Sequence, residues 1–148
     1  MRIAIDVRVL ARGGNSGIEE YTRNLILSLK PAVAARGDDL ILFYNGLRRS
    51  PLPSELQNEK IVNWSIPNKF LDLWVRLGVA SRIPGADLIF SPHFNLIPTG
   101  LAPRVITFHD LSFIHHPQFF SWKQRLWHKF QNWLEQAKKA AHIIAVSE

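Results

Sequence analysis

The sequence predicts an α/β fold in which helices cover both faces of a parallel sheet. Short apolar segments recur along the 148 residues, and amphipathic segments with helical periodicity separate them. Strands that alternate with helices favour parallel pairing, because each crossover returns the chain to the same end of the sheet. The apolar share of 47% is ordinary for a chain that buries a core, and the length fits one domain.

The first half of the chain contains three expected strands and two expected helices. The strands are expected at Arg2–Val7, Leu40–Tyr44 and Lys60–Trp64. A helix is expected after Ser16, because Ser16 and Glu19 have the spacing of a capping box. A second helix is expected over Phe70–Arg82, with Phe70, Trp74 and Leu77 facing the sheet.

The second half adds strands at Ala86–Phe90, Arg104–Phe108 and His142–Val146. Ser121 and Gln124 predict the capped start of one long helix, whose apolar stripe is Trp122, Leu126, Phe130, Trp133 and Ala137. The last strand is expected to be buried, and such a strand normally leads into another helix. We therefore expect residues 1–148 to be one domain of a longer protein.

Composition excludes some classes of protein. The chain has no cysteine, which excludes disulfides and thiolate metal sites. It has no apolar run of about 18 residues, the length of a membrane-spanning helix, and its charged N-terminus indicates mature structure and not a signal peptide. A net charge of +6 suits nucleic acid, anionic lipid or phosphorylated substrates as partners.

Polar residues follow four of the predicted strands at their carboxyl ends. These clusters are at 11–17, 91–95, 109–110 and 147–148. Ligands of open parallel sheets bind in the crevice beyond these strand ends. The sequence therefore predicts a binding site at this edge.

Three glycines, Gly13, Gly14 and Gly17, precede the first helix. Glycine permits close backbone approach, and a helix N-terminus favours an anion. Their spacing matches neither the dinucleotide fingerprint nor the P-loop, so a plain turn and an anion site both stay open. Glu19 and Glu20 either oppose a bound phosphate or complement the helix dipole.

Histidines are concentrated between residues 93 and 116. A metal site formed by His93, His109 and His115 is one reading, but adjacent side chains on an extended segment point in opposite directions. His109 follows a strand directly, where a neutral imidazole can bind a hydroxyl-rich ligand. Asp110 either orients His109 or caps the next turn.

Tryptophans on the two later helices stand beside lysines and arginines. Core packing with a solvated basic face is the favoured interpretation, and a membrane-surface patch is the alternative. Trp74 and Trp127 are the better candidates for exposure.

With these residues in view, the chain resembles the N-terminal domain of retaining glycosyltransferases of family 4, also called group 1. The matching segments are IAIDVRVL, GGNSGIEEYTRNLILSL, ADLIFSPHFNLIP, VITFHDLSFIHHPQFFS and AHIIAVSE, in this order. The combination of HDLSFIHHP with IIAVSE is the more specific part.

The resemblance implies the N-terminal, acceptor-side half of a GT-B fold, with a Rossmann-like sheet and with the C-terminal donor-binding domain absent from this chain. It implies a cytoplasmic hexosyltransferase, mannosyltransferase-like, that makes cell-surface polysaccharide or glycolipid and is inactive as the isolated fragment. The donor would be a nucleotide-diphosphate sugar such as GDP-mannose or a UDP-hexose, with no other cofactor. The acceptor would be a glycan or a polyprenyl-linked molecule, and the basic surface would contact the anionic inner membrane face.

The resemblance also assigns roles to individual residues. His109 would reach the donor sugar as the catalytic histidine, while Gly13, Gly14, Gly17 and Ser147 would approach the donor diphosphate. His93, Asn95 and Asp110 would line the cleft, and no metal is expected. Many relatives carry Gly-Arg where this chain has Glu19-Glu20, so a cationic phosphate contact there is not expected.

Other classes of function remain possible on the sequence alone. One is a non-catalytic domain that binds carbohydrate or nucleotide. Another is a metal-dependent hydrolase that uses His93, His109 and Asp110. Nucleic-acid binding is disfavoured, because the positive charge is spread along the chain without an aromatic-basic motif.

Overall fold

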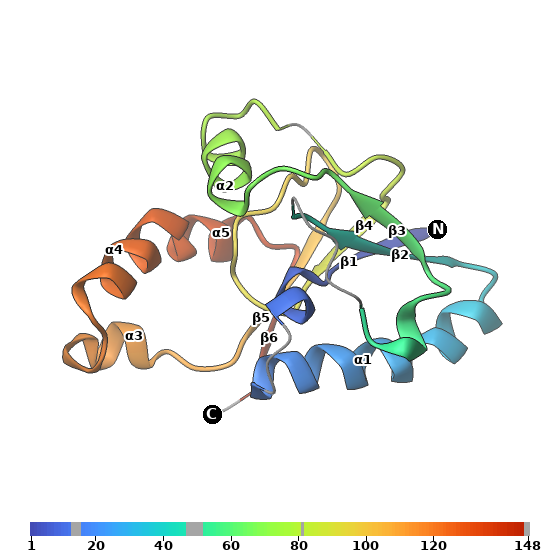
Figure 1. Cartoon of the computed structure of the whole chain (residues 1–148), viewed down its shortest axis with the longest axis horizontal. Coiled ribbons are helices and arrows are strands. Elements are labelled where there is room, and N and C mark those ends of the chain that lie inside the picture. The colour runs from blue at the N-terminus through green and yellow to red at the C-terminus, as the bar shows by residue number, and fades with distance from the viewer. Residues whose placement is uncertain (13–15, 47–51, 81, 147–148) are drawn as a thin grey trace.

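Six parallel strands form one sheet in the order β3-β2-β1-β4-β5-β6 (Figure 1). The computed structural model describes residues 1–12, 16–46, 52–80 and 82–146. The strands are β1 (Arg2–Asp6), β2 (Asp39–Tyr44), β3 (Lys60–Asn63), β4 (Leu88–Ser91), β5 (Arg104–Phe108) and β6 (His142–Ala145). The chain runs outward from β1 to β3 and then returns to the other side of β1 with β4, which creates a switch point between β1 and β4. This is a Rossmann-like α/β fold, as predicted.

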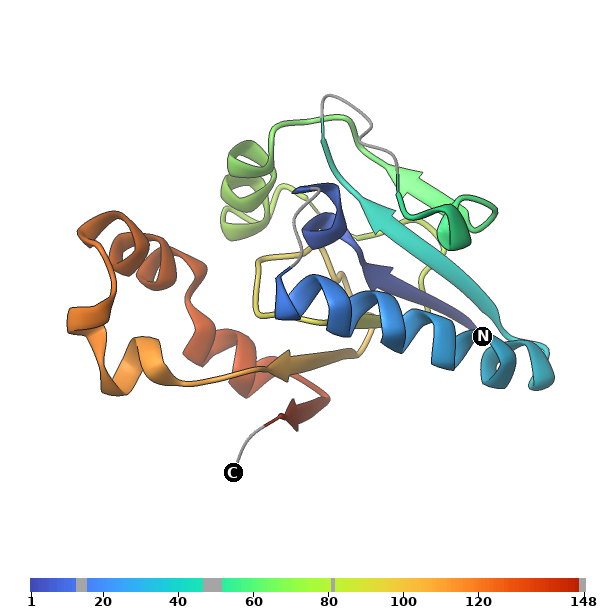
Figure 2. The same ribbon diagram turned by 60° about the horizontal axis from the view of Figure 1, so that its bottom comes forward.

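Helix α1 (Gly17–Ala35) covers one face of the sheet (Figure 2). The predicted capping box is present: the Ser16 backbone N–H donates to the Glu19 carboxylate at 2.7 Å, and the Ser16 hydroxyl accepts from the Glu19 N–H. The core on this face joins Ile26 and Val33 of α1 to apolar side chains of the central strands, including Ile5 and Leu42. Burial of this helical stripe positions the N-terminus of α1 at the carboxyl end of β1.

Helix α2 (Asn68–Arg76) covers the opposite face, with an orientation and a length that the sequence analysis predicted wrongly. Leu71 and Asp72 point inward, whereas Phe70 is 57% exposed and Trp74 and Leu77 are also exposed. The helix ends early because Gly78 adopts φ +72°, so that two backbone bonds close a Schellman motif: Gly78 N–H to Val75 O and Val79 N–H to Trp74 O.

Helices α3 (Ser112–His115), α4 (Trp122–Gln131) and α5 (Trp133–Lys139) lie between β5 and β6. The capping box of Ser121 and Gln124 is confirmed. The single long helix is wrong, because Asn132 adopts the left-handed conformation with φ 49° and separates α4 from α5. The predicted inward stripe is also wrong at its start, since Trp122 is 68% and Leu126 60% exposed.

Strand β6 forms the edge of the sheet beside β5, and most of its residues are exposed, so the expectation of a buried last strand is wrong. Short 3-10 helices that the sequence did not predict occur at η1 (Arg8–Arg12), η2 (Ser54–Leu56) and η3 (Pro117–Phe119). In the described segments, no helix has both the length and the apolar character required to cross a membrane.

Candidate functional site

A cavity of about 380 Å³ lies at the carboxyl edge of the sheet and contains the predicted cleft residues. It is lined by Val9, Ile18, His93, Phe94, Asn95, His109, Asp110, Phe113, Phe120, Gln124, Trp127 and His128. The structure therefore brings together His93, Asn95, His109 and Asp110, and places Gly17 beside the lining residue Ile18. Gly13, Gly14 and Ser147, which were also predicted, lie outside the described residues.

His109 is half-buried in this cavity and is held from two sides. Its Nε2 lies 2.7 Å from the carbonyl oxygen of Pro92, and its ring meets the edge of Tyr21 with centroids 4.8 Å apart. The Tyr21 hydroxyl in turn lies 3.1 Å from the Thr107 hydroxyl. Because a carbonyl oxygen can only accept, Nε2 is the donor in this contact, and in the tautomer with its proton on Nε2 the Nδ1 atom is a hydrogen-bond acceptor.

Asp110 caps the turn that follows the strand. Its Oδ1 accepts from the Ser112 backbone N–H at 2.9 Å and also from the Ser112 hydroxyl. Of the two roles that the sequence left open for Asp110, the structure shows the capping role. The Pro92 carbonyl, and not Asp110, fixes the His109 ring.

His93 is buried in the inner wall of the cavity. Its Nδ1 accepts from the Asn95 backbone N–H at 3.2 Å, and its Nε2 lies 3.9 Å from Oδ2 of Asp6. These contacts fix the loop after β4. His93 therefore serves the shape of the cavity and presents little of its ring to a ligand.

Gly17 begins α1 in open space, since a Cβ added there would meet no atom within 4 Å. The fold thus has no steric need for glycine at this position. The Glu19 carboxylate accepts a hydrogen bond from the Ser16 backbone N–H in the capping box, where its negative charge complements the helix dipole. The backbone N–H groups of the first turn form the positive end of the helix.

An aromatic wall that the sequence analysis missed covers the cavity opposite the sheet. The Phe113 and His128 rings lie 4.7 Å apart, and the Phe94 and Phe113 rings 5.1 Å apart, with Phe120 and Trp127 beside them. Burial lowers the pKa of His128, which favours the neutral form of the ring. Apolar walls with few polar groups are typical of sites for small organic ligands.

This wall was missed because its residues come from three separated segments. One signal was available: Gln124, Trp127 and His128 have the i, i+3, i+4 spacing that places side chains on one helix face.

A buried ion pair lies behind the His93 side of the cavity, and the sequence analysis did not predict it. Asp6 is fully buried and lies 2.7 Å from Arg8, whose guanidinium also donates to the Leu96 carbonyl at 2.7 Å and lies 3.5 Å from Asp72. Burial alone would raise the pKa of Asp6, but the charge and hydrogen bonds of Arg8 outweigh it and lower the pKa to about 2. The pair therefore links β1, the loop after β4 and α2.

A second buried arginine fixes the other side of this loop. Arg104 donates to the Ser91 hydroxyl at 2.8 Å, to the Asn95 carbonyl at 2.7 Å and to the Gln136 side chain. Burial lowers the pKa of Arg104 to about 9, so the guanidinium stays charged at pH 7. The loop that presents His93 and Asn95 is thus held by two buried guanidinium groups.

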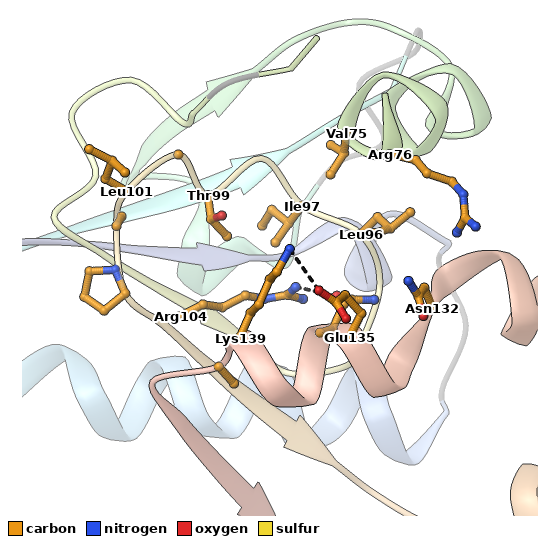
Figure 3. A pocket seen from close by; sticks show the side chains of 15 residues that line it. Val75, Arg76, Leu96, Ile97, Thr99, Leu101, Arg104, Asn132, Glu135 and Lys139 are labelled. Atoms are coloured by element: carbon orange, nitrogen blue, oxygen red, sulfur yellow. Dashed lines mark hydrogen bonds and ion pairs between the residues drawn. The ribbon is translucent and has the colours of Figure 1, made fainter. Parts of the chain in front are cut away.

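Another cavity, of about 690 Å³, lies between α2, α5 and the segment that leads into β5 (Figure 3). Charged groups on its wall pair with each other, as Glu135 does with Lys139 at 3.0 Å. Of the predicted site residues that the structure describes, none lines this cavity.

The described residues include no group of three or more His, Asp or Glu side chains that is arranged to hold a metal ion. In particular, His115 lines a separate hollow with His116 and does not join His93 and His109.

Together, the fold and the cavity define a Rossmann-like domain that binds its ligand at the carboxyl edge of a parallel sheet, beside the switch point. The family model described as Glycosyltransferase Family 4 matches residues 6–148, nearly the whole chain, and the chain belongs to this family. No curated protein and no solved structure matched in the corresponding comparisons.

Proposed function

We propose that this chain is the acceptor-side domain of a retaining, GT-B-type glycosyltransferase that uses a nucleotide-diphosphate sugar. The observation that carries the proposal is the fixed imidazole of His109 in an aromatic-walled cavity at the carboxyl edge, in a chain that belongs to this glycosyltransferase family. The donor is a hexose nucleotide such as GDP-mannose or a UDP-hexose. The product is a cell-surface polysaccharide or glycolipid made on the cytoplasmic side.

In the proposed reaction, the bond between the anomeric carbon and the donor diphosphate breaks. The acceptor hydroxyl oxygen forms the new bond to the anomeric carbon on the face that the diphosphate leaves. The hydroxyl proton leaves with the nucleoside diphosphate, so no enzyme carboxylate has to take it. Catalysis then depends on positioning and on stabilisation of charge. Nδ1 of His109 accepts a hydrogen bond from a sugar hydroxyl, and its fixed tautomer requires no reorganisation during the step.

The donor diphosphate is placed at the N-terminus of α1, where the backbone N–H groups after Ser16 and the helix dipole favour an anion. The open space around Gly17 supports this placement, because it leaves room for a phosphate close to the backbone. Gly13, Gly14 and Ser147 are assigned to the same diphosphate by their resemblance to the family.

A second, C-terminal domain supplies most of the donor contacts in this proposal, and the 148-residue chain alone is expected to be inactive. The mass of the intact native gene product tests this first. A product far above 17.0 kDa, with room for a second Rossmann-like domain, is expected. A product near 17.0 kDa contradicts the two-domain proposal and favours a non-catalytic binding domain.

The net charge of +6 supports peripheral contact with an anionic membrane. We expect the protein to co-sediment with vesicles that contain phosphatidylglycerol and to be released as salt is raised. Equal recovery with neutral and anionic vesicles contradicts this contact.

A further inference from the structure

A buried arginine, Arg104, lines the cavity of about 690 Å³ between α2, α5 and the segment that leads into β5 (Figure 3). The volume lies within the range of about 300–1,000 Å³ that is usual for small-molecule sites. Arg104 is the first residue of β5 and is only 7% exposed. Its hydrogen bonds go to neutral acceptors, namely the Ser91 hydroxyl, the Asn95 carbonyl and the Gln136 side chain. Within the described ranges, Arg104 forms no ion pair with a carboxylate.

The other buried arginine, Arg8, is neutralised, unlike Arg104. Arg8 lies 2.7 Å from Asp6 and 3.5 Å from Asp72, and these carboxylates raise its pKa although burial acts in the opposite direction. For Arg104, burial is the largest effect and lowers the pKa to about 9, and Asp6 opposes it without forming an ion pair. A buried charge is costly unless it is paired. Arg104 therefore keeps a capacity for an anion that Arg8 has already used.

The guanidinium of Arg104 also keeps hydrogen-bond donors for a ligand. A guanidinium has five N–H groups, and Nε, Nη1 and Nη2 of Arg104 each donate one hydrogen bond to a described residue. Each of the two Nη atoms has a second N–H group, which is available to an acceptor in the cavity. Phosphate and carboxylate oxygens are the acceptors that a guanidinium binds most strongly.

Lys139 of α5 adds a second cation to the same cavity. Its ammonium pairs with Glu135 at 3.0 Å, and Figure 3 shows this pair on the cavity wall. The two side chains are 76% and 48% exposed, so water screens the pair and a stronger anion can displace Glu135. The described lining has three cationic residues, Arg76, Arg104 and Lys139, and one carboxylate, Glu135. This excess of positive charge suits a dianion.

Helix dipoles account for two of these cations but not for Arg104. Arg76 and Lys139 lie in the last turns of α2 and α5, where a positive side chain complements the carbonyl end of the helix. Arg104 lies in a strand. Its hydrogen bonds hold the loop after β4, a role that a neutral donor could fill, so the fold itself gives no reason for a charge at this position.

Much of the remaining lining is apolar and suits the organic part of a ligand. Ile97 is buried and Leu101 is fully exposed, so the apolar lining extends from the interior to the mouth of the cavity. Inorganic phosphate would fill only a small part of this volume. A ligand that uses the whole cavity therefore combines a phosphate with an apolar group.

From these features we propose that this cavity binds a small organic phosphate monoester. Its dianionic phosphate lies between Arg104 and Lys139, and its organic group lies against Leu96 and Ile97. The loop after β4 separates this site from the cavity of His109, because Leu96 and Ile97 line the one and residues 93–95 line the other. The inference goes beyond the proposed function, in which neither the donor nor the acceptor occupies this cavity.

Titration of the complete gene product with phenyl phosphate tests the proposal, with calorimetry and the midpoint of thermal unfolding as readouts. UDP and GDP are present throughout, so that a nucleotide fills the donor site. We expect saturable binding of one phenyl phosphate per chain and an unfolding temperature that rises with its concentration. Phenol and inorganic phosphate should each bind at least about tenfold more weakly, because each makes only part of the contacts.

Three variants at exposed positions of the lining change its charge in known directions. Lys139→Gln removes a cation and should weaken phenyl phosphate at least about fivefold. Leu101→Glu places a carboxylate at the mouth and should also weaken it, whereas Glu135→Gln frees Lys139 and should tighten it at least about twofold. The three positions are exposed, so the variants should fold. Arg104→Gln should abolish binding, but it also disturbs the loop after β4, so the exposed positions carry the test.

Lys138→Gln is the matched control. Lys138 is exposed in the same last turn of α5 but does not line the cavity, so the affinity for phenyl phosphate should not change. Equal affinities of Lys139→Gln and Lys138→Gln, or no tightening in Glu135→Gln, overturn the proposal. A wild-type protein without saturable binding of phenyl phosphate overturns it as well.

Discussion

Replacement of Arg8 by methionine should destabilise the domain more than almost any other single substitution of similar volume. Arg8 is buried and forms bidentate contacts with the fully buried Asp6, and it also bonds the Leu96 carbonyl and Asp72. Arg8→Met leaves the Asp6 carboxylate in the interior without its main counter-charge. Removal of one partner of a buried pair costs about 3–5 kcal/mol, a large part of the 5–15 kcal/mol that typically stabilises a domain.

Urea unfolding at pH 7, followed by tryptophan fluorescence, measures this loss in the free energy of unfolding. Arg36→Met is the matched control, because the Arg36 side chain is 75% exposed and pairs with Asp38 at the surface, where such a pair contributes about 0–1 kcal/mol. The double variant Asp6→Asn/Arg8→Met removes both charges and should recover part of the loss. A loss below about 1 kcal/mol in Arg8→Met would refute the reasoning that this pair organises the interior.

Three further predictions concern single residues. The folded pKa of Asp6, about 2, lies below its unfolded value of 3.8, so its stabilising contribution is complete above about pH 5 and disappears as the pH falls through 2. This difference corresponds to about 2 kcal/mol, and the acid titration of stability should lose this component in Asp6→Asn. Asn132→Ala should cost about 1–2 kcal/mol, because alanine is disfavoured in the left-handed conformation that asparagine tolerates, while Asn132→Gly should stay within about 1 kcal/mol of wild type; equal effects in thermal unfolding would contradict this. Gly17→Ala should leave the free energy of unfolding unchanged or raise it by about 0.4–1 kcal/mol, because the added Cβ meets no atom. The same variant should weaken the binding of a nucleoside diphosphate to the complete gene product. Unchanged binding would favour a plain turn over an anion site at the start of α1.

Local rules predicted the strands and the helix starts because these depend on neighbouring residues. The apolar runs at Ile3–Ile5 and Ile41–Phe43 leave few alternatives to buried parallel strands. The capping boxes at Ser16 and Ser121 fix helix starts through backbone groups within three residues. The carboxyl-edge rule then predicted that His93, Asn95 and His109 lie at one edge, and the structure brings them into one cavity.

Tertiary contacts explain the errors. On α2, the stripe of Phe70, Trp74 and Leu77 looked like the inward face, but Leu71 is the buried residue, because Asp72 beside it turns inward to Arg8. Gly78 marks this helix end in the sequence, because glycine readily adopts the left-handed conformation that closes a helix.

The break at Asn132 has only a weak sequence signal, since asparagine tolerates the left-handed conformation but neither glycine nor proline occurs there. It allows the side chains of Gln131 and Gln136 to turn inward, toward Asp72 and Arg104 respectively. Polar residues on a helix are ordinarily assigned to solvent, so a network of buried amides is not visible from periodicity.

The role of His109 is tested by comparison of the complete gene product with its His109→Ala variant. Release of nucleoside diphosphate from a panel of nucleotide sugars would be followed, with His142→Ala on the exposed edge strand as the control. We expect a loss of at least about tenfold in turnover for His109→Ala, because a hydrogen bond in the transition state is removed, and none for the control. Turnover near that of the wild type in His109→Ala would contradict the assignment of this cavity as the site of transfer.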